Sequence, residues 1–226
     1  RHLALTRRIS DEGHELGNHT FTHPDLARRS PLATRLELDA TNRVIEAVVG
    51  RRTALFRPPY FGDAEPTTAD ALGPVRAATA LGFVTAGLHV DSRDWEPGLG
   101  PAAVVRATLR ARDARATDAH VVLLHDGGGD RAATLAALGP LVDSLRARGD
   151  SLVLLSELVG LSRDQAMPPL PPSSAAGRWA GLAAFAIAGA VDHGLTALLG
   201  AAVVLGIGRL ALVGALAAVE RRRGRR

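Results

Sequence analysis

The sequence predicts an α/β fold, with a parallel sheet or barrel, over about residues 1–160. Two observations predict this class. Helical patterns with recognisable end signals alternate along the chain with short apolar runs, an order that is typical of βα units. One of these runs, "HVVLLHD", is short and almost continuously apolar, as expected for a parallel strand that is buried on both faces.

Two helices are expected first. "HLALTRRISDEG" predicts a helix that ends at Gly13. The second helix runs from Ser30, a typical N-cap, through Pro31, which suits the first helical position, to Gly50, which suits the position after the end. Apolar residues at every fourth position predict its buried face: Leu36, Ala40, Val44 and Val48.

Strands and helices then alternate. Short strands are expected in "TALFRPPY", "FVTAGLHVD", "HVVLLHD" and "SLVLLSEL". The helices between them are expected in "TTADALGPVRAATALG", which Pro74 can kink, from Pro101 to about Arg115, and from the cap Asp130 to Arg148. In such an order the C-terminal ends of the strands lie on one face of the sheet, where sites are usually built.

The composition changes after the last expected strand. Residues 163–178 are rich in proline and small residues, which predicts a stiff, partly extended linker. The apolar stretch from Trp179 to Val191 is too short to cross a bilayer alone, and Asp192 to Gly194 are expected to break the apolar region after it. This stretch could lie at the interface, extend the span or form half of a hairpin.

The run from Leu195 to Val219 is the expected membrane span. It has 25 residues and one charge, Arg209, whereas about 20 apolar residues are enough to span. An arginine at the bilayer centre costs roughly 2.5–3.5 kcal/mol on the translocon-insertion scale, which the flanking leucines and valines offset. We therefore expect a membrane segment over residues 179–220, with its main span at 195–219. A pair of buried amphipathic helices is the alternative.

The charge distribution supports this reading. The net charge is +4, and it is −1 without the five arginines of the tail at residues 221–226. A nearly neutral body does not suit a nucleic-acid binder, which spreads positive charge over a face. A basic tail directly after a span suits the cytoplasmic side. We therefore expect a plasma-membrane protein with an extracytoplasmic N-terminal domain and a cytoplasmic C-terminus.

Two histidines four residues apart, His19 and His23, are the first candidate site residues. On one helical turn, side chains at this spacing share a face, so both rings can reach one ion. Neutral imidazole suits zinc and similar divalent metals. The spacing alone also fits solvated or capping histidines, and a catalytic zinc usually takes three protein ligands.

Further polar residues follow the expected strands. Arg57 follows one strand, Asp94 and Trp95 follow another, and His125 ends a third. If the strands are parallel, these side chains converge with the two histidines. Each residue alone also has a structural interpretation, such as a helix cap or a core histidine, but together and in this order they favour a site.

Four motifs carry a resemblance to a known family. "HTFTH" (residues 19–23), "RPPY" (57–60), "DSRDW" (91–95) and "LLH" (123–125) resemble, in order and spacing, four of the five motifs of the polysaccharide deacetylases with a NodB homology domain, carbohydrate esterase family 4. The likeness covers residues 1–162. It implies a distorted (β/α)7 barrel, which here would lack its first strand.

The family's first motif, of the form Thr-Phe-Asp-Asp-Gly, does not occur in this sequence. In the family it precedes a helix like the one expected at the start of this chain, so we expect an N-terminal truncation, with a degenerate relative as the alternative. The linker and membrane segment are also similar to bacterial fusions of a deacetylase, a transmembrane segment and a family-2 glycosyltransferase. That likeness implies a glycosyltransferase domain after residue 226.

The resemblance implies a role for each matching residue. A divalent metal, with zinc as the expected ion, would bind His19, His23 and an aspartate of the first motif, whose other aspartate would be the general base. His125 would be the general acid that protonates the leaving amine, and Asp94 would stabilise its imidazolium form.

The remaining motif residues would shape the site. Arg57 would pair with the base aspartate, and the backbone N–H of Tyr60 would hold the oxyanion. Leu123 would line the pocket for the acetyl methyl group, and Trp95 would shape the sugar groove. The expected activity is removal of acetyl groups from peptidoglycan, a chitin-like polymer or poly-N-acetylglucosamine. A membrane-tethered, non-catalytic glycan-binding module is the alternative.

Overall fold

The computed structural model describes residues 3–60 and 66–224, and the chain divides into two units, residues 1–175 and 176–226. His2, at which the first expected helix begins, lies outside the described residues, as do Arg225 and Arg226 of the basic tail.

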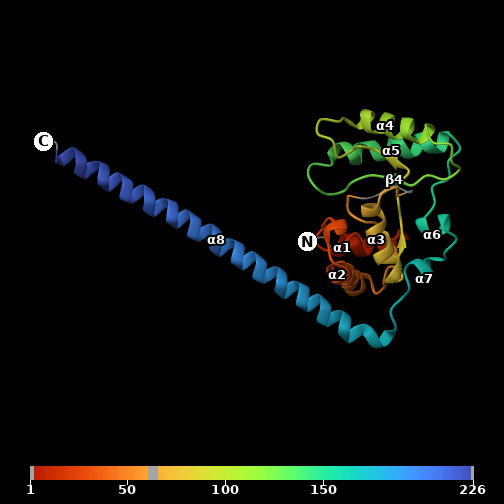
Figure 1. Ribbon diagram of the computed structural model, residues 1–226, viewed down its shortest axis with the longest axis horizontal. Coiled ribbons are helices and arrows are strands. Elements are labelled where there is room, and N and C mark those ends of the chain that lie inside the picture. Colours follow the sequence, from red (N-terminus) through yellow and green to blue (C-terminus); the bar gives the residue numbers. More distant parts are fainter. Residues whose placement is uncertain (1–2, 61–65, 225–226) are drawn as a thin grey trace. The chain divides into compact units, whose positions relative to one another are not determined.

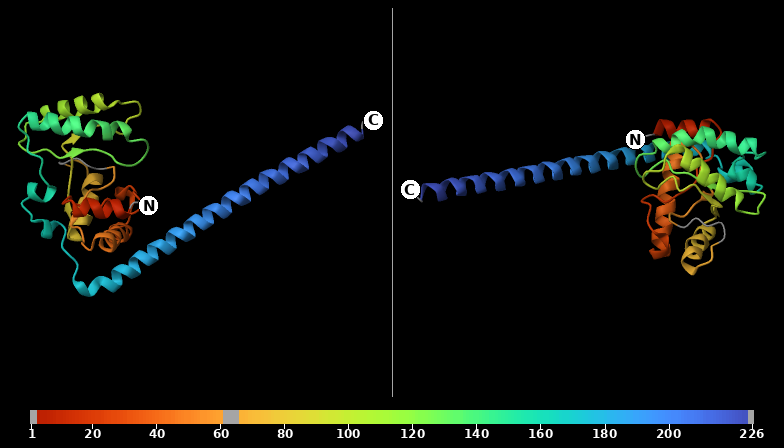
Figure 2. Two further views of the ribbon diagram at one scale, coloured as in Figure 1. Left: turned by 180° about the vertical axis from the view of Figure 1, so that it is seen from behind. Right: turned by 90° about the horizontal axis from the view of Figure 1, so that it is seen from above.

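Helices make up most of the first unit. Its longer helices are α1 (Leu3–Asp11), α2 (Pro31–Val49), α3 (Ala69–Ala80), α4 (Pro101–Asp113) and α5 (Ala132–Ala147). Its shorter helical turns are η1 (Leu26–Arg28), α6 (Leu155–Leu158), α7 (Arg163–Ala166) and η2 (Pro172–Ser174). Helices α4 and α5 pack side by side, and α2 packs against both α1 and α3 (Figure 1). Figure 2 shows the same unit from behind and from above. The helices expected from the sequence are therefore confirmed.

The ends of α2 are the ones that the sequence predicts. The Ser30 hydroxyl accepts a hydrogen bond from the N–H of Ala33, and Gly50 ends the helix with a φ of 72°. The predicted buried face is correct only in part, because Val48 is buried, Ala40 and Val44 are half-buried, and Leu36 is 60% exposed. A strict four-residue stripe drifts around a helix of 3.6 residues per turn. Most of the buried residues of α2 are instead three or four residues apart: Thr34, Leu38, Asn42, Ile45 and Val48.

One smaller expectation about the helices, the N-cap of α5, is wrong. Asp130 is not the N-cap of α5, since Arg131 occupies that position, although Asp130 Oδ1 still accepts from the N–H of Ala132 at 3.0 Å. Pro74 lies inside α3 without ending it. It is the sixth residue of that helix, so the helix tolerates a proline that removes one backbone donor.

Short parallel strands lie between the helices. They are β1 (Leu55–Phe56), β2 (Val84–Thr85), β3 (Val90–Asp91) and β4 (Val122–Leu123). β1 pairs with β2, and β3 pairs with β4, both in parallel. A further parallel bridge joins Asn18 to Phe56. The parallel α/β class is thus confirmed. The strands of the described residues form two separate pairs, so the expected barrel is not seen to close among them.

The strand expected in "SLVLLSEL" is wrong. Residues 151–154 form no ladder in the described part of the chain, and Leu155–Leu158 is the helical turn α6. A strand needs a neighbour for its backbone hydrogen bonds, and Leu152 and Val153 remain about half exposed. "HVVLLHD" does contain β4, but its two strand residues are only half-buried.

The proline-rich segment expected as a linker is partly folded against the first unit. Its residues 163–166 form α7, which Ser162 and Gln165 cap reciprocally. Met167 is fully buried, and the carbonyl of Ala166 accepts from the N–H of Ala54 at 2.8 Å. The folded part of the first unit therefore continues beyond residue 162, into the segment expected to be extended.

The core of the first unit places β1 beneath the site. Phe56 is 1% exposed and meets Phe83 edge to face, with ring centroids 6.1 Å apart. Leu26, Leu38 and Ala78 complete this cluster. Because Phe56 is held in the core, the next residue, Arg57, leaves the strand at a defined position beside the pocket.

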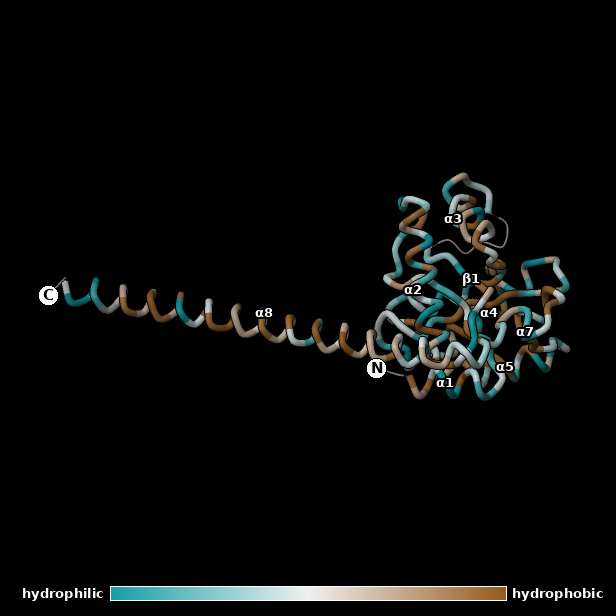
Figure 3. The backbone as a smooth tube through the Cα atoms, turned by 90° about the horizontal axis from the view of Figure 1, so that it is seen from below, coloured by the Kyte–Doolittle hydropathy of each residue, from teal (hydrophilic) through white to brown (hydrophobic). Residues whose placement is uncertain are grey.

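Within the described residues of the second unit, one helix, α8 (Ala175–Arg223), extends to Arg223. The expected break at Asp192–Gly194 is not present, since these residues lie inside one continuous helix, where a single glycine costs only about 1 kcal/mol. Among the described residues, this helix alone is long and apolar enough to cross a membrane by length and composition. Figure 3 shows that it is mostly hydrophobic, with a hydrophilic C-terminal end.

Candidate functional site

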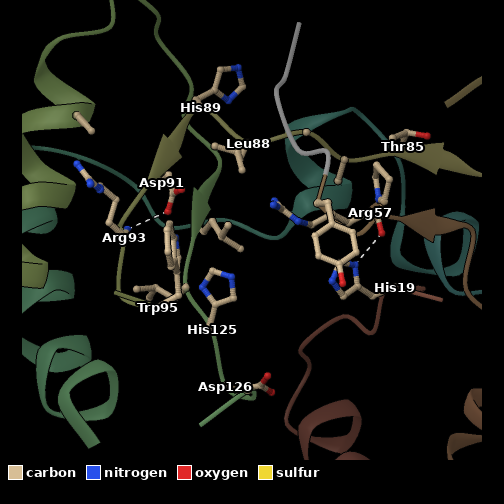
Figure 4. A pocket seen from close by; sticks show the side chains of 18 of the residues that line it. His19, Arg57, Thr85, Leu88, His89, Asp91, Arg93, Trp95, His125 and Asp126 are labelled. Atoms are coloured by element: carbon tan, nitrogen blue, oxygen red, sulfur yellow. Dashed lines mark hydrogen bonds between the residues drawn. The ribbon is translucent and has the colours of Figure 1, made fainter. Parts of the chain in front are cut away.

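An open pocket of about 1650 Å³ is lined by most of the site residues that the sequence predicts. Seven of them line it: His19, His23, Arg57, Tyr60, Trp95, Leu123 and His125. Figure 4 shows Arg57 and His19 on one side of the pocket, with Trp95, Asp91 and Arg93 on the other and His125 between them. The eighth residue, Asp94, is 6% exposed and lies behind His125.

The two histidines come together through a loop, not through a helical turn as the spacing suggested. Residues 19–23 are not helical. Thr20 and His23 have φ values of 66° and 57°, in the left-handed region, where a β-branched residue such as threonine is a rare outlier. This backbone turns the rings toward each other, with centroids 5.0 Å apart and planes at 78°.

The ring of His19 has a defined orientation. Its Nδ1 lies 2.8 Å from the carbonyl oxygen of Arg57. A carbonyl can only accept, so Nδ1 carries the proton, and Nε2 is the nitrogen left for another partner. Burial lowers the pKa of His19, and the Arg57 carbonyl opposes this effect. The neutral ring that results is the form of histidine that binds metals.

The pair fits two nitrogen ligands of a divalent metal. At the usual Zn–N distance of about 2.0–2.1 Å, two imidazoles in a tetrahedral shell have ring centroids about 5 Å apart, which agrees with the observed 5.0 Å. No group of three or more His, Asp or Glu side chains that could hold a metal occurs within residues 3–60 and 66–224. Among the described residues, His19 and His23 are the side chains that could supply two of the ligands of such a site.

His125 and Asp94 form a tightly held pair. Nδ1 of His125 donates to Oδ1 of Asp94 at 2.7 Å, and the backbone N–H of His125 donates to Oδ2 at 2.8 Å. The Asp94 side chain is completely buried, whereas that of His125 is 35% exposed. This two-point attachment directs the other ring nitrogen, Nε2, away from Asp94. His125 lines the pocket in this orientation.

Two hydroxyl groups complete the surroundings of the Asp94 carboxylate. Thr134 Oγ1 donates to Oδ2 at 2.9 Å, and Ser92 Oγ donates to Oδ1 at 3.0 Å. Burial raises the pKa of Asp94, but the hydrogen bonds from His125, Thr134 and Ser92 outweigh it, so the pKa lies below its ordinary value. Asp94 is therefore a carboxylate at neutral pH, and it accepts the hydrogen bond from Nδ1 of His125.

This carboxylate predicts a pH dependence of stability. Its pKa is lower in the folded than in the unfolded chain, where an aspartate titrates near pH 3.9. Its contribution to folding is thus present above about pH 4 and is lost as the pH falls through the folded-state pKa. Between about pH 5 and pH 2, we expect wild type to lose more free energy of unfolding than Asp94→Asn.

Urea unfolding at several pH values measures this difference. Asp118→Asn is a matched control, because Asp118 is exposed outside the pocket. Equal losses in wild type and Asp94→Asn would show that the Asp94 hydrogen bonds do not stabilise the folded state.

The "RPPY" segment forms another wall. Burial lowers the pKa of Arg57, and the charge of Asp91 opposes this. Pro59 is fully buried, which fixes the backbone that leads to Tyr60. Tyr60 has a φ of 65°, and its ring meets that of His23 edge to face, with centroids 5.0 Å apart. A left-handed backbone at a bulky residue is typical of functional sites.

Two further expected residues line the pocket from other elements. Trp95 follows β3 and is 49% exposed, so much of its indole is accessible. Leu123 is the last residue of β4 and is half-buried. An exposed indole and a half-buried leucine give the pocket an apolar surface of the kind that binds sugar rings and small apolar groups.

Sequence reasoning missed several residues that hold the site. Thr134 donates a hydrogen bond to Asp94 from 40 positions further along the chain. Glu37 lies on α2 and accepts a hydrogen bond from Thr22, in the loop between His19 and His23. Arg131 donates to the carbonyls of Gly127, Gly128 and Asp94 and so ties two loops together. None of these three residues belongs to a local motif. Ser92 lies within the motif "DSRDW", two positions before Asp94, but it was not predicted as a site residue.

Comparison with known proteins confirms the family resemblance. A family model described as polysaccharide deacetylase matches residues 1–80. A peptidoglycan-N-acetylglucosamine deacetylase of Bacillus cereus is 33% identical over 162 residues, which cover 70% of this chain and 70% of that protein.

Solved structures agree in fold. A peptidoglycan N-acetylglucosamine deacetylase in complex with a naphthyl N-hydroxybenzamide has a TM-score of 0.60 and 25% identity, covering 71% of this chain and 70% of that one. A carbohydrate esterase family 4 pseudoenzyme from Bacillus anthracis has a TM-score of 0.57 and 26% identity, covering 70% of this chain and 50% of that one.

Proposed function

This chain belongs to the polysaccharide deacetylase family, carbohydrate esterase family 4, and we propose that it hydrolyses acetamide groups of an N-acetylated amino-sugar polysaccharide. One observation carries the proposal. His125, which the buried Asp94 holds in place, lines the same open pocket as the histidine pair, His19 and His23. The pair of His125 and Asp94 is suited to proton transfer and the histidine pair to metal binding, and together they suit metal-assisted hydrolysis of an amide.

His19 and His23 would hold a divalent metal, with zinc as the ion that suits two neutral imidazoles. When bound, such a metal polarises the acetamide carbonyl and lowers the pKa of water. A third ligand and the general base are expected from aspartates of the family's first motif. The Arg57 guanidinium would pair with that base and favour its ionised form.

His125 acts as the general acid in this proposal. Collapse of the tetrahedral adduct breaks the carbon–nitrogen bond, and the leaving amine takes a proton from Nε2 of His125. Asp94 holds Nδ1 and stabilises the positive charge that the ring carries before this transfer. The products are acetate and the free amine of the sugar, and His125 is left neutral.

The other motif residues would bind the substrate. The Tyr60 N–H would donate to the oxyanion, Leu123 would contact the acetyl methyl group, and Trp95 would stack on a sugar ring at the rim of the pocket. The named activity of the similar Bacillus cereus protein supports peptidoglycan as the polymer. Chitin-like polymers and poly-N-acetylglucosamine are the other substrates of the same chemical class.

Mass spectrometry of N-acetylglucosamine oligomers incubated with the protein, as its gene encodes it, tests the activity. Loss of acetyl groups from intact oligomers supports the proposal. Cleavage between sugars, or unchanged oligomers, would contradict it.

A non-catalytic glycan-binding module is the second candidate. The likeness to a pseudoenzyme of the same family supports this second candidate. A glycan-binding module would have the same pocket and the same affinity for sugars, but it would release no acetate.

We also propose that α8 anchors the protein in the plasma membrane. Residues 195–219 would span about 37 Å at 1.5 Å per residue, enough for a hydrocarbon core of about 30 Å. A helix without a break suits one crossing better than a hairpin. Arg221 to Arg223 follow the apolar run, whereas Arg178 and Asp192 flank its other side, so the C-terminus belongs in the cytoplasm.

Protease protection in intact spheroplasts tests this orientation. We expect added protease to digest residues 1–175 while a tag at the C-terminus is protected. A cytoplasmic marker protein serves as the control for membrane integrity. A first unit shielded by verified membranes would refute the extracytoplasmic placement.

A further inference from the structure

Glu37 holds the loop between the two histidines of the site. It lies on α2, and its carboxylate accepts three hydrogen bonds from that loop. The N–H groups of Phe21 and Thr22 both donate to Oε2 at 2.8 Å, and the Thr22 hydroxyl donates to Oε1 at 2.5 Å. Hydrogen bonds to an ionised acceptor are about twice as strong as neutral ones. The residues that line the described pocket do not include Glu37, so it acts on the loop from outside.

A second attachment fixes the start of the same loop. Asn18 is fully buried, and its Nδ2 donates to the carbonyl of Leu38 at 2.8 Å. Its Oδ1 accepts from the N–H of Thr20 at 3.0 Å. The loop is therefore tied to two consecutive residues of α2, at its start through Asn18 and at its centre through Glu37.

These attachments stabilise a backbone conformation of the loop that is unfavourable by itself. Thr20 and His23 both have left-handed φ values, which non-glycine residues adopt only where their surroundings hold them. Within the loop, the His23 N–H donates to the Thr20 hydroxyl at 3.1 Å. If the carboxylate of Glu37 were removed, the peptide groups at Phe21 and Thr22 would lose their acceptor. The loop could then relax, and the relative position of the two imidazoles would change.

We propose that Glu37 is a positioning residue that sets the separation of His19 and His23 and thereby the affinity of the site for a divalent metal. The inference rests on the proposed role of these histidines as metal ligands. Glu37 needs no contact with the ion, because it acts through the backbone of the loop that carries both ligands. Partners that orient metal ligands typically change affinity by about 10–100-fold.

Titration of the detergent-solubilised protein with zinc, in competition with a chromogenic chelator, tests the proposal. Glu37→Ala removes all three acceptor bonds, and we expect the zinc dissociation constant to rise about tenfold. Glu37→Gln keeps one oxygen acceptor and should have a smaller effect. Asp39→Ala is the matched control, because Asp39 lies on the same helix but pairs with Arg35 on its surface. It should leave zinc affinity unchanged.

A second readout separates positioning from a general loss of stability. Amide hydrogen exchange at Phe21 and Thr22 should accelerate in Glu37→Ala and not in Asp39→Ala, while the melting temperatures of the two variants stay similar. If wild type binds zinc and Glu37→Ala binds it equally well, this inference fails while the metal site stands. If wild type binds no zinc, the proposed metal role fails and the inference falls with it.

Discussion

Replacing His125 with alanine is expected to lower kcat by about 10²–10⁴-fold on an N-acetylglucosamine oligomer, the range typical of a lost general acid. The physical reason is that an amine is expelled slowly unless it is protonated as the carbon–nitrogen bond breaks. In the structure the Asp94 carboxylate and the pocket are arranged around the ring of His125, and no other part of the proposal supplies this proton.

Two measurements show whether the loss comes from proton transfer. Zinc content should be unchanged, because His125 is assigned no role as a ligand, and the oligomer should bind with similar affinity. His14→Ala is a matched control, since His14 is exposed and outside the pocket. A variant that loses its metal, or keeps full activity, would show that the role given to His125 is wrong.

Replacing His19 or His23 with alanine is expected to weaken zinc binding by more than about 100-fold. Loss of a partner that merely orients a ligand already costs about 10–100-fold, and each of these variants removes a ligand itself. The two rings are 5.0 Å apart, so we expect both variants to show the same large effect.

Zinc titration of both variants, with His14→Ala again as the control, measures this loss. Circular dichroism verifies that the variants remain folded. Unchanged zinc affinity in either variant would remove that histidine from the metal site, even if activity falls for another reason.

The elements that the sequence predicted well depend on local chemistry. Ser30, Pro31 and Gly50 mark the ends of α2 through contacts within one or two turns, so three residue types suffice to place them. The strand expected in "SLVLLSEL" depends on a neighbour that sequence order does not reveal, and there the structure has α6. The buried face of α2 was predicted only in part: Val48 is buried, but a four-residue repeat does not follow the helix period, and Leu36 is exposed.

The candidate site also contains residues that the sequence could predict and residues that it could not. Residues that belong to short motifs, such as His19, Arg57 and His125, could be named because each motif is contiguous and recognisable. Glu37 and Thr134 could not, because they reach the site from helices 15 and 40 residues away from the groups they bind. A glutamate on a helix surface and a threonine near a helix start have no distinctive pattern, so only their tertiary contacts reveal them.

Acetate release and glycan binding, measured together, test whether this protein is a deacetylase that uses His125 as its general acid. The protein as its gene encodes it is incubated with an N-acetylglucosamine oligomer and zinc, beside its His125→Ala variant. If the protein is a deacetylase with His125 as its general acid, wild type releases acetate together with an equal amount of free amine, and the variant binds the oligomer but releases at least about 100-fold less acetate. Wild type that binds the oligomer without releasing acetate would instead be a glycan-binding module.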